Sequence, residues 1–406
     1  MISKINDIMM HNTAAIESWF QEQWQQTPPP LTSSIDLRNA HFKLSHVDTN
    51  LFPAGFNNLH ETFLPTCIQS AKKTLNMLLP KCNNILLIPE NHTRNNFYLE
   101  HLYVLQQIFI QAGFNVRIGS LDPQYCQTWL VNNNQTIIFE PLMRQNNKLL
   151  LENFDPSIIL LNNDLSTGIP EILQNLIQPI MPTAQLGWST RSKANHFFIF
   201  NQIVTEFSQQ LSIDPWLLSP YSIAVNNIDF ISKTGIEKLI DETAQLLHKI
   251  TTKYQQYNIN EPPFIVIKAD NGTYGMNVMM INDIQTLHTL NRKQRTRMSA
   301  SKGGNVVNKV IVQEGVYTTD KTTTGDIAEP VIYMIGEFVV GSFYRAHQNR
   351  SNNDNLNTPG MYFHHSDLHQ DNNYTYGVNA RLAALAAAHE IAHMERLQNI
   401  TGKFSQ

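Results

Sequence analysis

The pattern of apolar runs changes at a pair of prolines, Glu261-Pro-Pro263, and this change most limits the fold of the chain. Before the prolines, short apolar runs such as Ile85–Ile88 and Ile158–Leu161 alternate with longer amphipathic stretches such as Asn96–Phe114. The short runs predict buried strands, and the amphipathic stretches predict helices. Strands that alternate with helices favour a mostly parallel, doubly wound, Rossmann-like sheet, although a mixed α+β fold gives the same pattern.

Beyond the prolines, strands follow one another with only short turns between them, which is typical of antiparallel sheet. The expected strands are Phe264–Lys268, Val278–Ile281, Val306–Gln313, Val331–Ile335 and Phe338–Phe343, and an alanine-rich helix of about Asn379–Leu397 closes the chain. We therefore expect an α/β (α+β) protein with an N-terminal substrate domain over residues 1–186 and a second domain over residues 187–406. The second domain is expected to be mostly helical over 187–262 and β-rich over 263–406.

Charge and cysteine content exclude several classes of function. The formal net charge is −4 over 406 residues, so no broad positive field attracts nucleic acid or an anionic membrane. No apolar run approaches the roughly 18 residues needed to span a bilayer. The first residues also lack the apolar core of a secretion signal. Three cysteines without Cys-x-x-Cys spacing favour a reducing compartment. The sequence therefore predicts a cytoplasmic protein that binds neither nucleic acid nor membrane, and it leaves a homo-oligomer open.

The segment Ile267–Met276 places Lys268 at the end of a predicted strand and two glycines, Gly272 and Gly275, in the loop that follows. Glycines let backbone N–H groups approach a polyphosphate closely, and the lysine adds a positive charge for its oxygens. A β-hairpin whose turn contains glycine explains this segment equally well on its own. The residue order of a Walker A loop is absent.

Three further segments follow along the chain. Val310–Val316 is an apolar strand that ends in an acid and a glycine, where backbone groups can meet an adenine edge and the acid a ribose or an amine. A predicted hairpin around Gly336-Glu337 has Arg345 at its far end, and a polar loop then contains Asn355-Leu-Asn357. Together with the glycine segment, these features indicate a nucleotide site.

This order of segments resembles the ATP-grasp arrangement of bacterial glutathione synthetases, whose upstream lysine is matched here by Lys193 in Ser192–Phe198. In that family two lysines reach the nucleotide phosphates, a glycine loop folds over them, the next strand contacts the adenine, and an arginine steadies the transferred phosphoryl group. The resemblance implies that ATP is bound, and the matching positions are Lys193, Lys268, Gly272, Thr273, Tyr274, Gly275, Gln313, Glu314, Gly315, Val316 and Arg345.

A closer resemblance covers nearly the whole chain. Five long strings look like those of the proteobacterial glutamate–cysteine ligase family, which has an ATP-grasp-like fold; they are Val47–Asn58, Ile88–Asn95, Leu161–Ser166, Gly187–Arg191 and Asn357–Phe363. The resemblance implies that glutamate, cysteine and ATP, with Mg²⁺, form γ-glutamylcysteine in the first step of glutathione synthesis. Another amino-acid ligase, such as a glutathione synthetase, is the alternative.

Two of these strings come directly after predicted strands, where doubly wound sheets bind their ligands. Glu90–Asn95 follows one strand and Asn162–Ser166 follows another, although Asn and Asp are also common in solvated turns. Arg94 is the candidate for a substrate carboxylate, because its guanidinium can hold one with two parallel hydrogen bonds. The predicted substrate residues are Asn57, Asn58, Arg94, Asn95, Asn163 and Asp164, and the predicted catalytic residues are Lys268, Arg345 and Arg94.

The magnesium ligands depart from the glutathione synthetase pattern, in which they lie on a late strand beyond the Asn-Leu loop. This chain has a predicted helix there instead, so the ligands must come from elsewhere. Mg²⁺ usually takes few protein ligands and relies on phosphate oxygens, so a sparse set is sufficient. The candidates are Glu329, Asn355 and Asn357.

A different class of function is suggested by His389-Glu390-Ile-Ala-His393, which fits the H-E-x-x-H pattern of zinc peptidases. Such a site also needs a third ligand, and the residues after His393 lack the glycine and third histidine of metzincins. The favoured interpretation is therefore the polar face of a terminal helix. A zinc peptidase and a non-catalytic nucleotide-binding protein are the alternatives from other classes.

Overall fold

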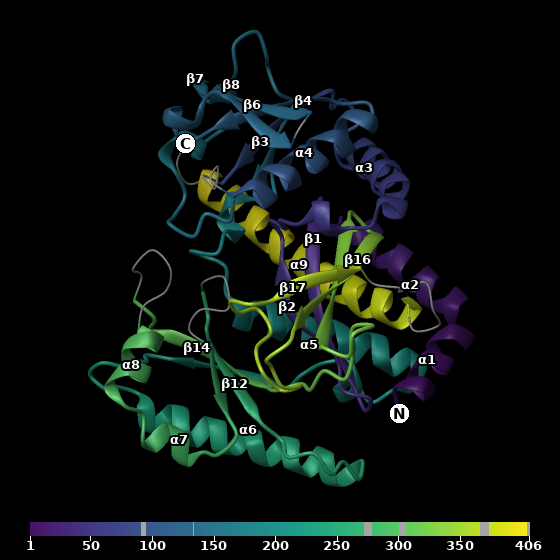
Figure 1. Cartoon of the computed structure of the whole chain (residues 1–406), viewed down its shortest axis with the longest axis vertical. Coiled ribbons are helices and arrows are strands. Elements are labelled where there is room, and N and C mark those ends of the chain that lie inside the picture. Colours follow the sequence, from purple (N-terminus) through teal and green to yellow (C-terminus); the bar gives the residue numbers. More distant parts are fainter. Residues whose placement is uncertain (91–94, 133, 272–277, 300–305, 366–372, 404–406) are drawn as a thin grey trace.

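The computed structural model describes residues 1–90, 95–132, 134–271, 278–299, 306–365 and 373–403 (Figure 1). These residues form a six-stranded, a five-stranded and a four-stranded sheet, together with a two-stranded ribbon of β7 (Met143–Gln145) and β8 (Lys148–Leu150). Helices cover the sheets and connect them. The candidate site depends on how the two larger antiparallel sheets face each other.

The six-stranded sheet is mostly parallel. Its strands, in spatial order, are β10 (Ile180–Met181), β9 (Ile158–Asn162), β3 (Asn84–Pro89), β4 (Asn115–Ser120), β6 (Gln135–Pro141) and β5 (Thr128–Asn132). Only β5 runs antiparallel to its neighbour. β3 and β9 are almost entirely apolar because both faces of the sheet are covered there. Ile85 and Leu87 pack towards α3 (Leu64–Leu78) and α4 (Asn96–Gln111), whereas Leu86 and Ile88 belong to a separate core.

The five-stranded sheet joins the two ends of the chain. Its antiparallel strands, in spatial order, are β17 (Tyr362–His365), β16 (Phe338–His347), β15 (Ile327–Ile335), β1 (Thr32–Asn39) and β2 (Leu44–Asn50). Ile35 on β1 lies opposite Ile332 on β15. Residues 32–50 therefore complete a sheet whose other strands come from beyond residue 326, while the division into domains at residue 186 stays a prediction.

The four-stranded sheet is antiparallel and consists, in spatial order, of β11 (Ser222–Asn226), β14 (Lys309–Glu314), β12 (Ile265–Ala269) and β13 (Val278–Ile281). Two long helices, α5 (Lys193–Leu211) and α6 (Ile236–Gln256), share its core. In α6 the buried residues Leu239, Leu246 and Ile250 recur at spacings of seven and four, so a single face of the helix is apolar.

The remaining elements are α1 (Ile2–His11), α2 (Thr13–Gln26), α7 (Gln285–His288), α8 (Arg292–Ser299), α9 (Asn373–Lys403) and the short 3-10 helices Phe56–Asn58, Glu61–Phe63, Pro123–Tyr125, Glu171–Leu173, Ala184–Leu186 and Pro215–Leu217. Helix α9 crosses the middle of the molecule, from the side of α1 and α2 to the six-stranded sheet (Figure 1). Its alanine-rich part, residues 382–388, is buried because small side chains allow β2 and α5 to approach closely.

The expected mixed α/β organisation is confirmed: a mostly parallel sheet lies in the first half of the chain, and the two larger antiparallel sheets take all their strands but β1 and β2 from the second half. The helix expected to reach Phe114 ends at Gln111, because Gly113 adopts a left-handed conformation (φ +102°) that stops helices. The last helix begins at Asn373 rather than Asn379. Among the described helices, none has the length and apolar composition needed to cross a membrane.

Candidate active site

One face of the five-stranded sheet forms the floor of a cavity of about 300 Å³. Side chains alternate along β1, so Ser34, Asp36 and Arg38 line the cavity while Ile35 and Leu37 pack into the core on the other face. The neighbouring strands extend this floor with Glu329, Val331, Tyr333, Phe343 and Arg345. The floor therefore combines charged groups with an apolar border.

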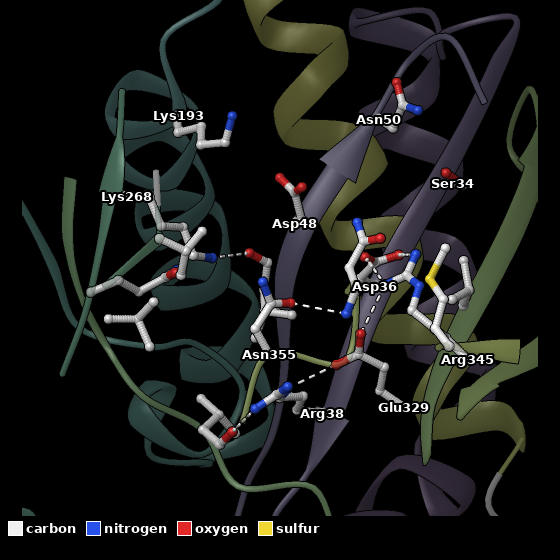
Figure 2. Close-up of a pocket in the computed structure, with 18 of the residues that line it drawn as sticks. Ser34, Asp36, Arg38, Asp48, Asn50, Lys193, Lys268, Glu329, Arg345 and Asn355 are labelled. Atoms are coloured by element: carbon white, nitrogen blue, oxygen red, sulfur yellow. Dashed lines mark hydrogen bonds and ion pairs between the residues drawn. The ribbon is translucent and has the colours of Figure 1, made fainter. Parts of the chain in front are cut away.

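The four-stranded sheet forms the opposite wall, as Figure 2 shows. Lys268 on β12 contributes a charge to it, and Val266, Val278 and Met280 make it largely apolar. Such a wall can accept the flat face of an aromatic base. The remaining sides are closed by residues after β3 and β9, by the start of α5 and by a polar loop, through Glu90, Asp164, Trp188, Lys193, Asn353, Asn355 and Asn357.

Two arginines and two carboxylates form a connected network on the floor (Figure 2). Arg345 Nη1 lies 2.6 Å from Asp36 Oδ2 and 2.8 Å from Glu329 Oε1. Arg38 Nε lies 2.9 Å from Glu329 Oε2 and also donates from Nη1 to the carbonyl oxygen of Val316 at 3.1 Å. The network therefore links three strands of the floor to the segment that follows β14.

The two carboxylates differ in their proton affinity. Burial raises the pKa of Asp36, and the nearby charges of Glu329 and Asp48 add to this rise, so that Arg345 only partly offsets it. Burial acts in the same direction on Glu329, but the guanidiniums of Arg38 and Arg345 outweigh it and lower the pKa of that carboxyl. Glu329 is therefore the firm counter-ion of the two arginines.

Two lysines reach the cavity from different elements. Burial lowers the pKa of Lys193 to about 8, although the Asp48 carboxylate acts against this shift, and its Nζ lies 3.9 Å from the centre of the Trp188 ring. Burial also lowers the pKa of Lys268, whose Nζ donates to the carbonyl oxygen of Val47 at 2.8 Å. An anionic ligand between the two amines would favour their charged forms.

A β-bulge turns the end of β2 towards the cavity. Leu37 lies opposite His46, but Asp36 lies opposite Asp48, so Val47 is an extra residue in β2. His46 stacks on an aromatic ring in the core, whereas Asp48 lines the cavity. In a regular strand, His46 and Asp48 would share a face because they are two residues apart, and the bulge at Val47 places them on opposite faces. Two carboxylates are thus placed on directly opposite residues, which is unfavourable unless a cation lies between them.

A model of the family described as glutamate-cysteine ligase matches residues 6–391 of this chain. The chain belongs to the glutamate–cysteine ligase family. It is therefore a ligase, and this family of ligases uses ATP. A comparison with curated proteins found no match.

Solved structures similar to this ligase were also found. A provisionally named gamma-glutamylcysteine synthetase from Methylobacillus flagellatus KT is 45% identical over 96% of both chains, with a TM-score of 0.90. A glutathione synthetase-like effector from Globodera pallida is 12% identical over 87% of this chain and 77% of its own, with a TM-score of 0.41. D-alanyl-alanine synthetase A from Vibrio cholerae is 11% identical over 75% and 81%, with a TM-score of 0.34.

The cavity of the ligase collects most of the described residues that the sequence pointed to for ATP, phosphoryl transfer and metal, and one of those predicted for the substrate, Asp164. Its lining includes Lys193, Lys268, Gln313, Glu314, Val316, Glu329, Arg345, Asn355, Asn357 and Asp164. Gly315 lies next to the lining, and its N–H donates to the carbonyl oxygen of Phe264 at 2.8 Å. Five predicted residues lie outside the described part of the chain: Arg94, Gly272, Thr273, Tyr274 and Gly275.

The sequence suggested that the carboxylate of Glu314 is free to meet a ribose, but the structure places it elsewhere. Its carboxylate is fully buried, lies 3.0 Å from Lys43 Nζ, and accepts hydrogen bonds from Trp216 Nε1 at 3.0 Å and from the N–H of Tyr221 at 3.0 Å. All of these partners belong to the core behind the wall. The side chain thus holds β14 in place, and only the rest of the residue borders the cavity.

Four of the predicted substrate residues do not line the cavity. Asn163 donates from Nδ2 to the carbonyl oxygen of Pro89 at 3.1 Å and so ties the end of β9 to the end of β3. Asn95 caps α4 by accepting from the N–H of Phe97. The other two, Asn57 and Asn58, form a short 3-10 helix near α4. Their part in substrate binding stays a prediction.

Sequence reasoning missed the residues that β1 and β2 bring to the cavity, namely Ser34, Asp36, Arg38, Asp48 and Asn50. The alternation of polar and apolar residues in Ser34-Ile-Asp-Leu-Arg38 is the signal that could have shown one face of this strand to be polar. Asp48 and Asn50 stand inside the string Val47–Asn58 that carried the family resemblance, but no role followed from it.

The H-E-x-x-H motif has a structural position in the ligase. Glu390 is 1% exposed and its Oε2 lies 2.7 Å from Arg191 Nη2, whereas His393 is exposed. Burial alone would raise the pKa of this carboxyl, but Arg191 and His196 lower it to about 2. Among the described residues, no group of three or more His, Cys, Asp or Glu side chains is arranged to hold a metal. The motif therefore anchors a helix here.

Proposed function

We propose that this ligase joins the side-chain carboxylate of glutamate to the amine of cysteine through an acyl phosphate. A carboxylate oxygen attacks the γ-phosphorus of ATP, and ADP leaves. The deprotonated amine then attacks the carbonyl carbon, and phosphate leaves as the amide bond forms. The observation that carries the proposal is that Lys193, Lys268 and Arg345 line one cavity in a member of this family.

The phosphates of ATP are proposed to lie between Lys193 and Lys268, with the adenine against the apolar wall of β12 and β13. Each ammonium has three donors, so Lys268 can keep its hydrogen bond to Val47 and still meet a phosphate oxygen. The glycine loop after β12 would fold over the phosphates and exclude water, which otherwise hydrolyses an acyl phosphate. Positioning and charge neutralisation are then the main work of the protein.

Mg²⁺ fits the charge of this cavity. Four cationic and five acidic side chains line it, because the carboxylate of Glu314 turns into the core, so a bound ATP would add negative charge to a site that is already negative. A divalent cation offsets that charge and polarises the phosphoryl group for attack. Because the described residues offer no ready-made metal cluster, phosphate oxygens would supply several of the ligands.

Asp48 is the carboxylate that we propose for the metal, in addition to the predicted Asn355 and Asn357. Its side chain forms no hydrogen bond or ion pair with the other described residues, and Figure 2 places it between Lys193 and the Asp36 network. Glu329, the remaining predicted ligand, is less suited because Arg38 and Arg345 occupy both of its oxygens.

Arg345 is proposed to steady the transferred phosphoryl group. Asp36 and Glu329 fix its terminal nitrogens, and its buried Nε has no hydrogen-bond partner among the residues that the structure describes. Because the residue lines the cavity, an oxygen of the phosphoryl group can approach the fixed guanidinium. Glutamate binding by Arg94 and Asp164 completes the proposal, since Asp164 lies on the cavity wall and can attract an ammonium group.

The reaction is tested by measuring phosphate release from ATP and Mg²⁺ with glutamate and cysteine, and with each amino acid omitted in turn. Release that needs both, with a γ-glutamyl dipeptide in the mass spectrum, is the expected result. Release only with γ-glutamylcysteine and glycine would replace the proposed substrates by those of a glutathione synthetase. No release in either mixture would overturn the proposed reaction.

A further inference from the structure

Glu390 does not line the cavity, yet it binds Arg191, which stands between the lining residues Trp188 and Lys193 in the sequence. Its carboxylate binds Arg191 through two contacts, Oε1 to Nε at 3.2 Å and Oε2 to Nη2 at 2.7 Å. Both side chains are at most 3% exposed. A planar guanidinium held on two atoms by one carboxylate has its direction fixed, so the third nitrogen of Arg191 has only one place to point.

That third nitrogen reaches β2. Arg191 Nη1 donates to the carbonyl oxygen of Thr49 at 2.5 Å, next to Asp48 in the chain. On the other side of Asp48, the carbonyl oxygen of Val47 accepts from Lys268 at 2.8 Å. The main chain around Asp48 is therefore held by two cations, one from each side, at the place where the β-bulge turns it towards the cavity.

Arg191 also belongs to the segment that begins α5. Lys193 is two residues further on, and its N–H donates to the carbonyl oxygen of Asp270 at 2.9 Å. Trp188, in the same segment, carries both cations over its ring, with Arg191 Cζ at 5.6 Å and Lys193 Nζ at 3.9 Å. One short segment thus connects α9, β2 and the lysine of the cavity.

A second contact of Glu390 supports the same strand. His196 Nδ1 lies 2.7 Å from Glu390 Oε2, and its Nε2 lies 3.1 Å from Nε2 of His46 on β2. Both imidazoles are buried, and burial lowers the pKa of each. Glu390 therefore holds β2 at two points, through Arg191 at Thr49 and through His196 at His46.

We infer that Glu390 is a positioning residue of the active site, which acts through Arg191 to fix the separation between Asp48 on β2 and Lys193 on α5. The inference rests on the proposed function, because it takes these two groups to hold the metal and the phosphates of the nucleotide. It gives the H-E-x-x-H segment a role in the ligase reaction that does not involve zinc.

A merely structural ion pair is available for comparison on the same helix. Arg381 Nη1 lies 2.7 Å from Glu17 Oε1 and links α9 to α2, and neither residue lines the cavity. The test pairs Arg191→Met/Glu390→Met with the control Arg381→Met/Glu17→Met. Each double variant removes both charges together, which avoids leaving one buried charge without its partner.

The measurements are the thermal midpoint, kcat, KM for ATP and the Kd for ADP by calorimetry. The Arg191/Glu390 double variant is expected to stay folded, to lose on the order of 100-fold in kcat/KM for ATP, and to bind ADP more weakly. The control is expected to keep wild-type kinetics. A folded Arg191/Glu390 variant with kcat/KM within about twofold of wild type would overturn the inference.

If the double variant does not fold, the single variant Arg191→Lys tests the inference instead. Lysine retains the charge opposite Glu390 but has no fork to reach Glu390, Thr49 and His196 together. The same loss of kcat/KM and of ADP affinity is expected, and wild-type values would overturn the inference. Failure of the proposed function gives a different result, because the wild-type protein would then release no phosphate. The Kd values for ADP of wild type and variants would still show whether Glu390 positions the nucleotide-binding residues.

Discussion

Arg345 and Asp36 are separated by 309 residues in the sequence, and they lie 2.6 Å apart across the floor of the cavity. The pair is possible because β1 joins the sheet of β15 and β16, where Glu329 lies opposite Arg345. β1 therefore has to pair with strands from the far end of the sequence before the charges of the site are balanced. This relationship makes the network a contributor to stability as well as to chemistry.

Replacement of Arg345 by methionine is expected to destabilise the protein. It would leave Asp36 and Glu329 buried with less positive charge nearby, and loss of one partner of a buried pair costs about 3–5 kcal/mol. Denaturant unfolding measures this cost. Arg292→Met, at an exposed arginine, is the control and should change the free energy of unfolding by less than about 0.5 kcal/mol. Equal stability of the two variants would show that the network contributes little.

Lys268→Met is expected to remove most of the activity while keeping the fold. Its ammonium lines the cavity and makes one hydrogen bond to Val47, so the loss in the free energy of unfolding should stay near 1 kcal/mol. A phosphate would lose a charged donor, which corresponds to roughly a 100-fold or greater fall in kcat. Phosphate release and thermal unfolding, measured together, check both parts. Lys249→Met, at an exposed lysine over the Tyr221 ring, should behave as wild type. Normal turnover in the Lys268 variant would exclude that residue from the site.

Much of the second half of the fold could be predicted because its strands are local, apolar and separated by turn residues. This holds for four strands, β12, β13, β15 and β16. Lys268 and Arg345 could be assigned to the site because each stands at the end of a predicted strand. The start of α9 was missed because Gly377 lies inside the helix, where glycine is normally unfavourable.

The first strands escaped prediction for a different physical reason. Only two apolar residues of β1, Ile35 and Leu37, lie on the face that packs into the core. The strand is stabilised by pairing with β15, which follows almost 300 residues later in the sequence. The position of Asp48 depends on the bulge at Val47, which leaves no local pattern. For Glu314, the sequence correctly predicted a position at the end of a strand beside the cavity, but it did not show that the side chain turns into the core.

The two histidines of the H-E-x-x-H motif are expected to be dispensable for the ligase. His389 is half-buried and His393 is exposed, and neither lines the cavity. The double variant His389→Ala/His393→Ala should keep kcat and KM within about twofold of wild type. Elemental analysis of the wild-type protein should show no stoichiometric zinc. One zinc per chain, lost together with activity in the variant, would revive the hydrolase interpretation.

The affinity of the free enzyme for ATP is expected to fall as the pH rises through about 8. Burial lowers the pKa of Lys193 to about 8, so its ammonium is charged below that pH and progressively neutral above it. Because kcat/KM reports the ionisation of the free enzyme, its profile for ATP should decline on the alkaline side from about pH 8. In the variant Lys193→Arg the guanidinium stays protonated, so the decline in kcat/KM for ATP should begin at a higher pH. An unchanged alkaline limb in the variant would assign the titration to another group, such as Lys268, whose pKa is also lowered by burial.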